Sequence, residues 1–335
     1  MVLLPLIFVL GSSFAIGWAR TGQLKIMCQV KRWVPMADAK KIAVIGLGSM
    51  GYGIASSIMR AGHSTYGYDI MPENVTRFQA EGGSTASLAD IAPDLDIVVI
   101  VVLNAAQTEA VMFGDAGVVK LLKPGAVVIS CATVAPEFAR RMDSQCSDMD
   151  VLYLDAPMSG GSVKAAAGQL SFMASGSSET FTAARPALDA TAETVFELGD
   201  EVGAGSAMKA VNQLLAGVHI AAMAEALTFG MTQGVEPAKF LEVISKCAGT
   251  SWMLENRAPH VIDGDYTPHS QIDIWPKDLG IVLDIAKSAK FGAPLTAAAL
   301  QQFITASGSG LGGEDDAAIA KIYARNAGLT LPGDD

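Results

Sequence analysis

The chain of 335 residues has few of the residues that mark several large protein classes. Only 23 residues are lysine or arginine against 34 aspartate or glutamate, and a net charge of −11 argues against a nucleic-acid partner. The four cysteines and four histidines are scattered, without a CxxC pair or a cysteine–histidine ligand spacing. We therefore predict no disulfide and no metal site, and expect buried, reduced thiols in a cytosolic enzyme.

Hydrophobic residues are abundant at 50% of the chain, and the length suggests two domains. The first 35 residues do not resemble either domain, because residues 2–19 are almost wholly apolar and basic residues begin only at Arg20. This stretch is borderline in length for a membrane span and lacks the basic start of a secretory signal. A membrane anchor or targeting segment is one interpretation; the other, which we favour, is that translation begins at Met36.

A dinucleotide-binding pattern follows directly. The apolar run Lys41–Ile45 enters a glycine triplet with GxGxxG spacing, and a helical pattern comes next. Gly46 permits the tight turn, Gly48 leaves room for a pyrophosphate, and Gly51 lets the helix pack closely on the strand. The helix start offers free N–H groups and a partial positive charge. We predict that this loop binds the cofactor pyrophosphate through Gly46, Leu47, Gly48, Ser49, Met50 and Gly51.

Asp69 ends the second strand about 20 residues later, where a carboxylate can accept hydrogen bonds from ribose hydroxyls. A helix cap or turn residue is the alternative. A ribose role favours NAD over NADP, because the carboxylate would repel a 2′-phosphate and the first arginine after it is Arg77.

Further apolar segments at 96–103, 126–130, 151–155 and 170–174 are typical of buried strands, and helical segments separate them. Beyond Gly203 the patterns are helical up to Tyr323. We predict an α/β fold with an N-terminal Rossmann domain (36–202) built on a parallel-rich sheet, then a long interdomain helix within an all-α C-terminal domain (203–330). The apolar length of that helix also predicts a homodimer or homotetramer.

A serine–glycine loop follows the strand at 151–155, in the sequence Asp155-Ala-Pro157-Met-Ser159-Gly160-Gly161. In open α/β sheets ligands bind at the carboxyl ends of the strands. The hydroxyl of Ser159 and the unobstructed N–H groups of Gly160 and Gly161 suit a substrate carboxylate. A simple turn is the alternative.

Lys209 lies in the first turns of an otherwise apolar helix. Burial and the positive helix N-terminus should both lower its pKa. A lysine near neutrality can take a proton from an alcohol or return it. Asn212 follows one turn later and can hold a substrate hydroxyl or carboxylate. The alternative is a lysine that extends along the helix edge to solvent.

These motifs together resemble the β-hydroxyacid dehydrogenase family, from Lys41 to Tyr323 and including its D-x-P-x-S-G-G and A-x-x-G motifs at 155–168. The resemblance implies an NAD-dependent oxidoreductase in which Lys209 is the general acid/base and Asn212 orients a short hydroxy acid. It also implies that Lys277, in Lys277-Asp278-Leu279, contacts the cofactor or substrate. The loops after two strands would add cofactor contacts at Leu103, Asn104 and Thr133.

The chain departs from much of the family at Leu103-Asn104-Ala-Ala-Gln107 and at Cys131-Ala132-Thr133. These segments, with 215–227 and 313–323, resemble the L-threonate dehydrogenase branch, which implies oxidation at C2 to 2-oxo-tetronate. Asn104 and Gln107 would then serve a polyhydroxylated substrate, whereas His219 is expected to be a satisfied core residue. The alternatives are a 3-hydroxyisobutyrate dehydrogenase, a tartronate semialdehyde reductase and, more remotely, a non-catalytic NAD-sensing protein.

Overall fold

The computed structural model describes residues 15–18, 24–27, 39–84 and 86–333, and the chain divides into two compact units. In the first unit, Met1–Ala39, the strands β1 (Ala15–Trp18) and β2 (Leu24–Met27) pair antiparallel. Most of the predicted extension 1–35 lies outside the described residues, so its role as an anchor or as untranslated sequence stays a prediction. The second unit, Lys40–Asp335, contains all that follows.

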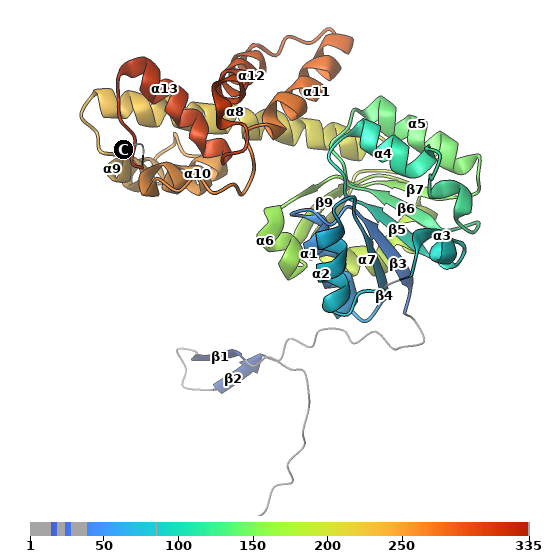
Figure 1. Ribbon diagram of the computed structural model, residues 1–335. Helices are drawn as coiled ribbons and strands as arrows, with labels where there is room; N and C mark the ends of the chain where they lie inside the picture. The colour runs from blue at the N-terminus through green and yellow to red at the C-terminus, as the bar shows by residue number, and fades with distance from the viewer. Residues whose placement is uncertain (1–14, 19–23, 28–38, 85, 334–335) are drawn as a thin grey trace, which may run out of the picture. The chain divides into compact units, whose positions relative to one another are not determined.

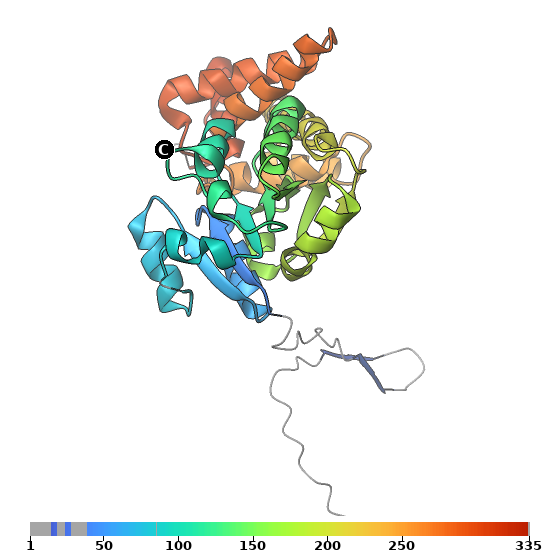
Figure 2. The ribbon, with the colours of Figure 1, turned by 90° about the vertical axis from the view of Figure 1, so that its right-hand side faces the viewer.

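A five-stranded parallel sheet forms the first half of this unit, in the order β4-β3-β5-β6-β7 (Figures 1 and 2). Its strands are β3 (Lys41–Ile45), β4 (Ser64–Tyr68), β5 (Ile97–Ile100), β6 (Val127–Ser130) and β7 (Leu152–Asp155). Alternate residues enter opposite cores: Ile42 and Val44 join one, Ala43 and Ile45 the other. The predicted parallel sheet buried on both faces is therefore confirmed.

Helices cover both faces of this sheet (Figure 1). One core receives side chains of α1 (Gly51–Arg60), α2 (Pro72–Ala80) and α7 (Ser178–Thr191). The other receives α3 (Leu88–Ile91), α4 (Ala105–Phe113) and α5 (Pro136–Ser147). Because all five strands run the same way, the loops that follow β3, β5, β6 and β7 emerge at one edge of the sheet.

A second, smaller sheet combines one predicted strand with two that the sequence pattern did not reveal. It contains β8 (Met158–Ser159), β9 (Leu170–Ala174) and β10 (Ala192–Glu197), with β9 parallel to β10 and antiparallel to β8. β9 is the predicted strand. No residue of β10 is fully buried, so it lacks the apolar run that marks an interior strand.

The second half of the unit is helical, and α8 (Ala204–Thr232) runs through it (Figure 1). Around α8 lie α9 (Pro237–Ile244), α10 (Trp252–Asp263), α11 (Ile274–Ser288), α12 (Pro294–Ala306), the short η5 (Asp316–Ile319) and α13 (Ala320–Ala327). Within residues 204–333 there is no strand, as predicted. The fold class is therefore confirmed, and the boundary predicted at 202/203 lies just ahead of α8.

By length and composition alone, α8 could cross a membrane. Its residues Ile220, Ala224 and Leu227 instead form one core with Trp275 and Phe303 of the surrounding helices. We therefore interpret α8 as the central helix of the helical half.

The cysteines only partly follow expectation. Cys131 and Cys146 are free and buried, and burial raises the pKa of each thiol to about 12. Cys247 is free but exposed, so the prediction of buried thiols was wrong for this residue. It follows the last turn of α9, where the helical core does not reach it. Cys28 lies outside the described residues.

Candidate active site

The loop after β3 has the shape that its glycines predict. Gly46 has φ +98°, and a Cβ there would collide with the carbonyl oxygen of Val101 in the loop after β5. A Cβ on Gly51 would collide with the carbonyl oxygen of Gly46, so only glycine lets α1 begin this close to the turn. The Cβ position of Gly48 has no atom within 4 Å, which leaves the open space that a pyrophosphate needs.

The start of α1 is also free to receive an anion. It has no side-chain cap and no acidic residue in its first turn. Its first N–H groups and the positive end of its dipole therefore have no negative partner of their own. The residues present fit a dinucleotide pyrophosphate.

Asp69 holds this loop from the end of β4. One carboxylate oxygen accepts a hydrogen bond from the N–H of Leu47 at 2.5 Å, and the other accepts from the N–H of Met71 at 2.8 Å. Asp69 is thus a turn residue, which was the alternative interpretation. The ribose role remains compatible, because each carboxylate oxygen has a second lone pair and the side chain is partly exposed.

Asp155, at the end of β7, fastens the start of α8. Its carboxylate is fully buried and accepts hydrogen bonds from the N–H groups of Gly203 (3.1 Å) and Ser206 (2.8 Å) and from the Ser206 hydroxyl (2.7 Å). The Ser175 hydroxyl donates to it at 3.3 Å. Burial raises the pKa of Asp155, and these hydrogen bonds oppose the rise. The first motif residue of the serine–glycine loop therefore positions a helix.

Lys209 lies in the second turn of α8 and is buried, with 9% of its surface exposed. Its Nζ donates a hydrogen bond of 2.9 Å to the carbonyl oxygen of Met158. The pKa of Lys209 is lowered to about 8, chiefly by burial; the carboxylate of Asp278 opposes this lowering and the charge of Lys277 adds to it. The alternative of a lysine reaching solvent is therefore wrong, and the predicted lowering of its pKa is supported.

The bond to Met158 places the Lys209 amine one residue from Ser159 in β8. Gly160 and Gly161 follow with φ of +137° and +75°, values that favour glycine, and α6 (Gly161–Ala167) begins there. Two of the three predicted motifs thus meet in one place. They combine a buried amine with a hydroxyl and glycine N–H groups.

Gln213 and Asp278, to which the sequence analysis assigned no role, connect α8 with α11. Gln213 Nε2 donates to Asp278 Oδ2 at 2.5 Å, and Gln213 Oε1 accepts from Asn212 Nδ2 at 2.9 Å. Asp278 Oδ1 lies 2.9 Å from Lys277 Nζ. In the sequence, only position could have indicated these roles. Gln213 stands one turn after Lys209, and Asp278 directly follows Lys277.

Lys277 also joins the two halves. Its Nζ donates to the carbonyl oxygen of Leu103, in the loop after β5, at 2.7 Å. Leu103, a predicted cofactor residue, therefore contacts Lys277, which is predicted to contact the cofactor or substrate. Thr133, in the loop after β6, is partly buried and stays a prediction.

The same loop shows a local role for the polar residues assigned to the substrate. Asn104 is the N-cap of α4 and accepts from the N–H of Gln107 at 2.9 Å; Gln107 accepts from the N–H of Leu103 at 2.8 Å. Each acceptor oxygen thus has one local donor, and its second lone pair and the NH₂ group stay available for a substrate. His219 is partly buried and makes no hydrogen bond to the described residues, so it is not the satisfied core residue expected.

Two family models match the chain: residues 41–199 match the NAD binding domain of 6-phosphogluconate dehydrogenase, and residues 203–323 match the model described as NAD-binding of NADP-dependent 3-hydroxyisobutyrate dehydrogenase. The L-threonate dehydrogenase of Cupriavidus necator is 49% identical over 296 residues, which is 88% of this chain and 99% of that protein. The L-threonate dehydrogenase of Escherichia coli is 46% identical over 294 residues, 87% of this chain and 96% of its own.

Among solved structures, a 3-hydroxyisobutyrate dehydrogenase from Salmonella typhimurium has 46% identity and a TM-score of 0.79, with 84% of this chain and 99% of that chain covered. Both halves of the chain, and not the Rossmann half alone, therefore match dehydrogenases.

Proposed function

The chain belongs to the β-hydroxyacid dehydrogenase family of NAD-binding oxidoreductases, and on that premise we propose that it oxidises L-threonate to 2-oxo-tetronate. The observation that carries the chemistry is the buried Lys209 amine, whose pKa is lowered to about 8 and which is held beside Ser159 by its bond to Met158. The substrate is inferred from the relatives at 45–49% identity that are named L-threonate dehydrogenases.

In the proposed reaction, Lys209 takes the proton of the C2 hydroxyl as the hydride leaves C2. When bound, NAD supplies the hydride acceptor, so the products are the 2-oxo acid and NADH with one proton. Ser159, Gly160 and Gly161 bind the carboxylate, and Asn212 orients the substrate. Lys277 holds the loop at Leu103 and contacts the cofactor or substrate. The carboxylate of Asp278 opposes the lowering of the Lys209 pKa, and Gln213 positions this carboxylate by donating a hydrogen bond to it.

Asp69 supports NAD over NADP as the better cofactor. Its carboxylate is fixed by two backbone N–H groups, so it cannot turn away from a 2′-phosphate without breaking the glycine turn. Repulsion and a lost hydrogen bond should cost on the order of 1–3 kcal/mol, or about 5- to 150-fold in affinity.

The proposal is tested by measuring NADH formation with a set of short hydroxy acids. We expect kcat/KM for L-threonate with NAD to exceed that for 3-hydroxyisobutyrate at least tenfold, and to exceed that for L-threonate with NADP. Tartronate semialdehyde with NADH tests the reductase alternative in the other direction. A higher kcat/KM for 3-hydroxyisobutyrate would overturn the substrate assignment. It would favour a 3-hydroxyisobutyrate dehydrogenase, as the 46% identical structure is named. No turnover with any acid would favour the NAD-sensing alternative.

We propose that the active form is a homo-oligomer built on α8. One face of this helix has apolar residues at alternating spacings of three and four, and within the described residues 40–84 and 86–333 it stays exposed except at Val218, which packs partly against the helical core. The face, here called the α8 seam, consists of Met208, Val211, Leu215, Val218, Ala222, Glu225 and Phe229. Only Glu225 is charged. This is the heptad spacing with which two helices pack together.

A second copy of the chain is the occupant that the α8 seam fits. The seam extends along α8 from Met208 to Phe229, so it runs for about 32 Å. A symmetric pair needs a self-complementary surface, and a helix face that is apolar except at Glu225 meets this condition. The catalytic Lys209 lies on the opposite, buried face, so pairing leaves it in place.

Replacing Leu215 or Phe229 by glutamate is expected to dissociate the oligomer, because symmetric pairing would bury like charges. A cost of several kcal/mol should raise the dissociation constant at least about 100-fold. Light scattering after size-exclusion chromatography measures the mass. Val243→Glu, at an exposed valine of α9 outside the seam, is the matched control. An unchanged mass in both seam variants would refute this interface.

We infer a cytoplasmic site of action, as for a dehydrogenase with free thiols. Attachment to a membrane through residues 1–35 is the alternative, and mass spectrometry of the native N-terminus distinguishes the two.

A further inference from the structure

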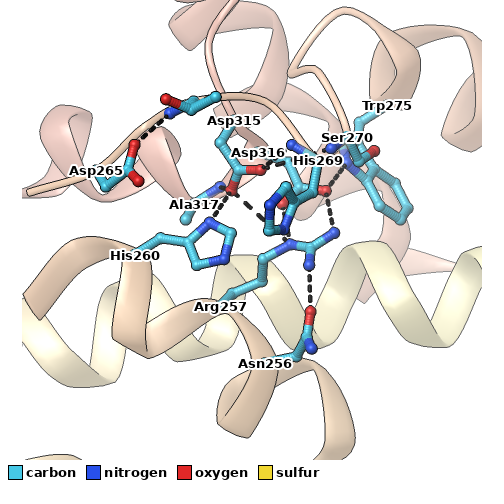
Figure 3. Close-up of polar contacts among 11 residues, drawn as sticks. Asn256, Arg257, His260, Asp265, His269, Ser270, Trp275, Asp315, Asp316 and Ala317 are labelled. Atoms are coloured by element: carbon cyan, nitrogen blue, oxygen red, sulfur yellow. Dashed lines mark hydrogen bonds and ion pairs between the residues drawn. The ribbon is translucent and has the colours of Figure 1, made fainter. Parts of the chain in front are cut away.

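Two histidines and an aspartate meet in the helical half, away from Lys209 (Figure 3). His260 lies near the end of α10, His269 in the segment before α11, and Asp315 directly before η5. One ring nitrogen of each histidine and one carboxylate oxygen of Asp315 lie within 4.8 Å of one another. We propose that this cluster, here called the His–Asp cluster, binds a divalent transition-metal ion such as Zn²⁺. The proposal does not depend on the proposed function.

Asp315 is fixed in place before any ion arrives. It is fully buried, and its Oδ1 accepts from the N–H of Ala317 at 3.1 Å while its Oδ2 accepts from the N–H of His269 at 2.8 Å. His260 Nδ1 lies 2.9 Å from Oδ1. This contact holds the His260 ring beside the carboxylate, so two of the three proposed ligand groups are already in place.

His269 supplies the open side of the cluster. Its ring is exposed, meets the ring of His260 edge-on with centroids 4.8 Å apart, and makes no hydrogen bond to the described residues. Imidazole nitrogens are ligands that suit zinc-class ions, and here two rings lie side by side. An ion can reach them from solvent past the exposed ring, and this is the entry path that a metal site requires.

The charge around the cluster also favours a cation. Asp315 and Asp316 are both buried, and one guanidinium serves them both. Arg257 Nε lies 2.5 Å from Asp316 and 3.9 Å from Asp315. With neutral histidines the group therefore carries net negative charge in a buried setting, which is costly. A divalent ion would compensate it.

The ligands come from three segments, so a bound ion would cross-link them. The segment with His269 pairs with 312–316 through Ile272 N–H to Glu314 O (3.0 Å) and Asp316 N–H to Ser270 O (2.8 Å). This segment leads directly into α11, which carries Lys277 and Asp278. We therefore expect the ion to stabilise the helical half. The sequence analysis predicted no metal site because the spacing 260, 269, 315 matches no ligand pattern; the fold alone assembles the cluster.

The test uses the full chain, first treated with a chelator and then titrated with Zn²⁺ by calorimetry. We expect one site per chain and a rise of a few degrees in Tm at saturating Zn²⁺. Co²⁺ should give the visible absorption of a nitrogen- and oxygen-ligated ion. His269→Ala should weaken Zn²⁺ binding at least about tenfold and abolish the Tm rise. Gln271→Ala, an exposed residue of the same segment, should change neither.

His269→Ala decides the proposal, because it removes an exposed ring without a hydrogen bond and should leave the fold intact, which an unchanged Tm without metal confirms. His260→Ala is less clean, since it also removes the contact to Asp315. Equal Zn²⁺ affinity in the His269→Ala variant would place the ion elsewhere, for example at the exposed Cys247, and overturn the site. Absence of any Zn²⁺-dependent heat or Tm shift in the unaltered protein would overturn it as well.

Discussion

Replacing Lys209 by methionine is expected to lower kcat by roughly 10²- to 10⁴-fold, the usual contribution of a general acid/base. Methionine keeps the apolar stem but cannot take a proton, so the buried site should stay filled. The affinity for NAD should remain near that of the unaltered protein, because the glycine loop is not changed. Steady-state kinetics and NAD titration by fluorescence measure the two quantities.

Lys287→Met, at an exposed lysine of α11, is the control and should leave kcat unchanged. The pH profile supplies a second readout. The amine acts as a base only when neutral, so the rate of oxidation should rise with pH through the Lys209 pKa of about 8, whereas the reverse reduction should fall. Near-normal kcat in Lys209→Met would remove this residue from the mechanism.

The second large effect is expected on stability. Replacing Asp155 by alanine should lower the free energy of unfolding by roughly 3–5 kcal/mol, because several buried donors lose their acceptor at a cost of about 1–3 kcal/mol each. The change leaves the N–H groups of Gly203 and Ser206 and the Ser206 hydroxyl buried without their acceptor. Urea denaturation, followed by circular dichroism, measures the change.

Asp189→Ala, at an exposed aspartate of α7, is the matched control and should stay within about 0.5 kcal/mol of the unaltered protein. Asp155→Asn keeps one acceptor oxygen, so its free energy of unfolding should lie between those of Asp155→Ala and the unaltered protein. A loss below about 1 kcal/mol in Asp155→Ala would show that α8 does not depend on this cap.

Local chemistry explains why much of the fold could be predicted. The β-branched runs of β3, β5 and β6 are buried on both faces, so each is visible as a continuous apolar segment. β10 was missed because it is mostly exposed and shows no such run. β8 was missed because two residues are too few to form a pattern.

A site residue could be predicted where its residue type has few structural reasons to occur at that position. A lysine inside an apolar helix is one such residue, and its burial is confirmed. Asp278 and Gln213 were missed because their meeting, at 2.5 Å, depends on how α11 crosses α8. Spacing along the chain does not encode that crossing. Asn104 and Gln107 show that polarity has more than one use: their acceptor oxygens also serve the start of α4, and their substrate contacts stay a prediction.

The cap that Asp155 makes has a mechanical consequence. The first turn of α8 is fastened to the end of β7, and the rest of the same helix forms the centre of the helical half. One rigid rod thus belongs to both halves, and a wide hinge opening between them would have to bend that rod or pull out its anchored end. The 2.7 Å contact between Lys277 and Leu103 is a second link between the halves, so we expect them to move little relative to each other.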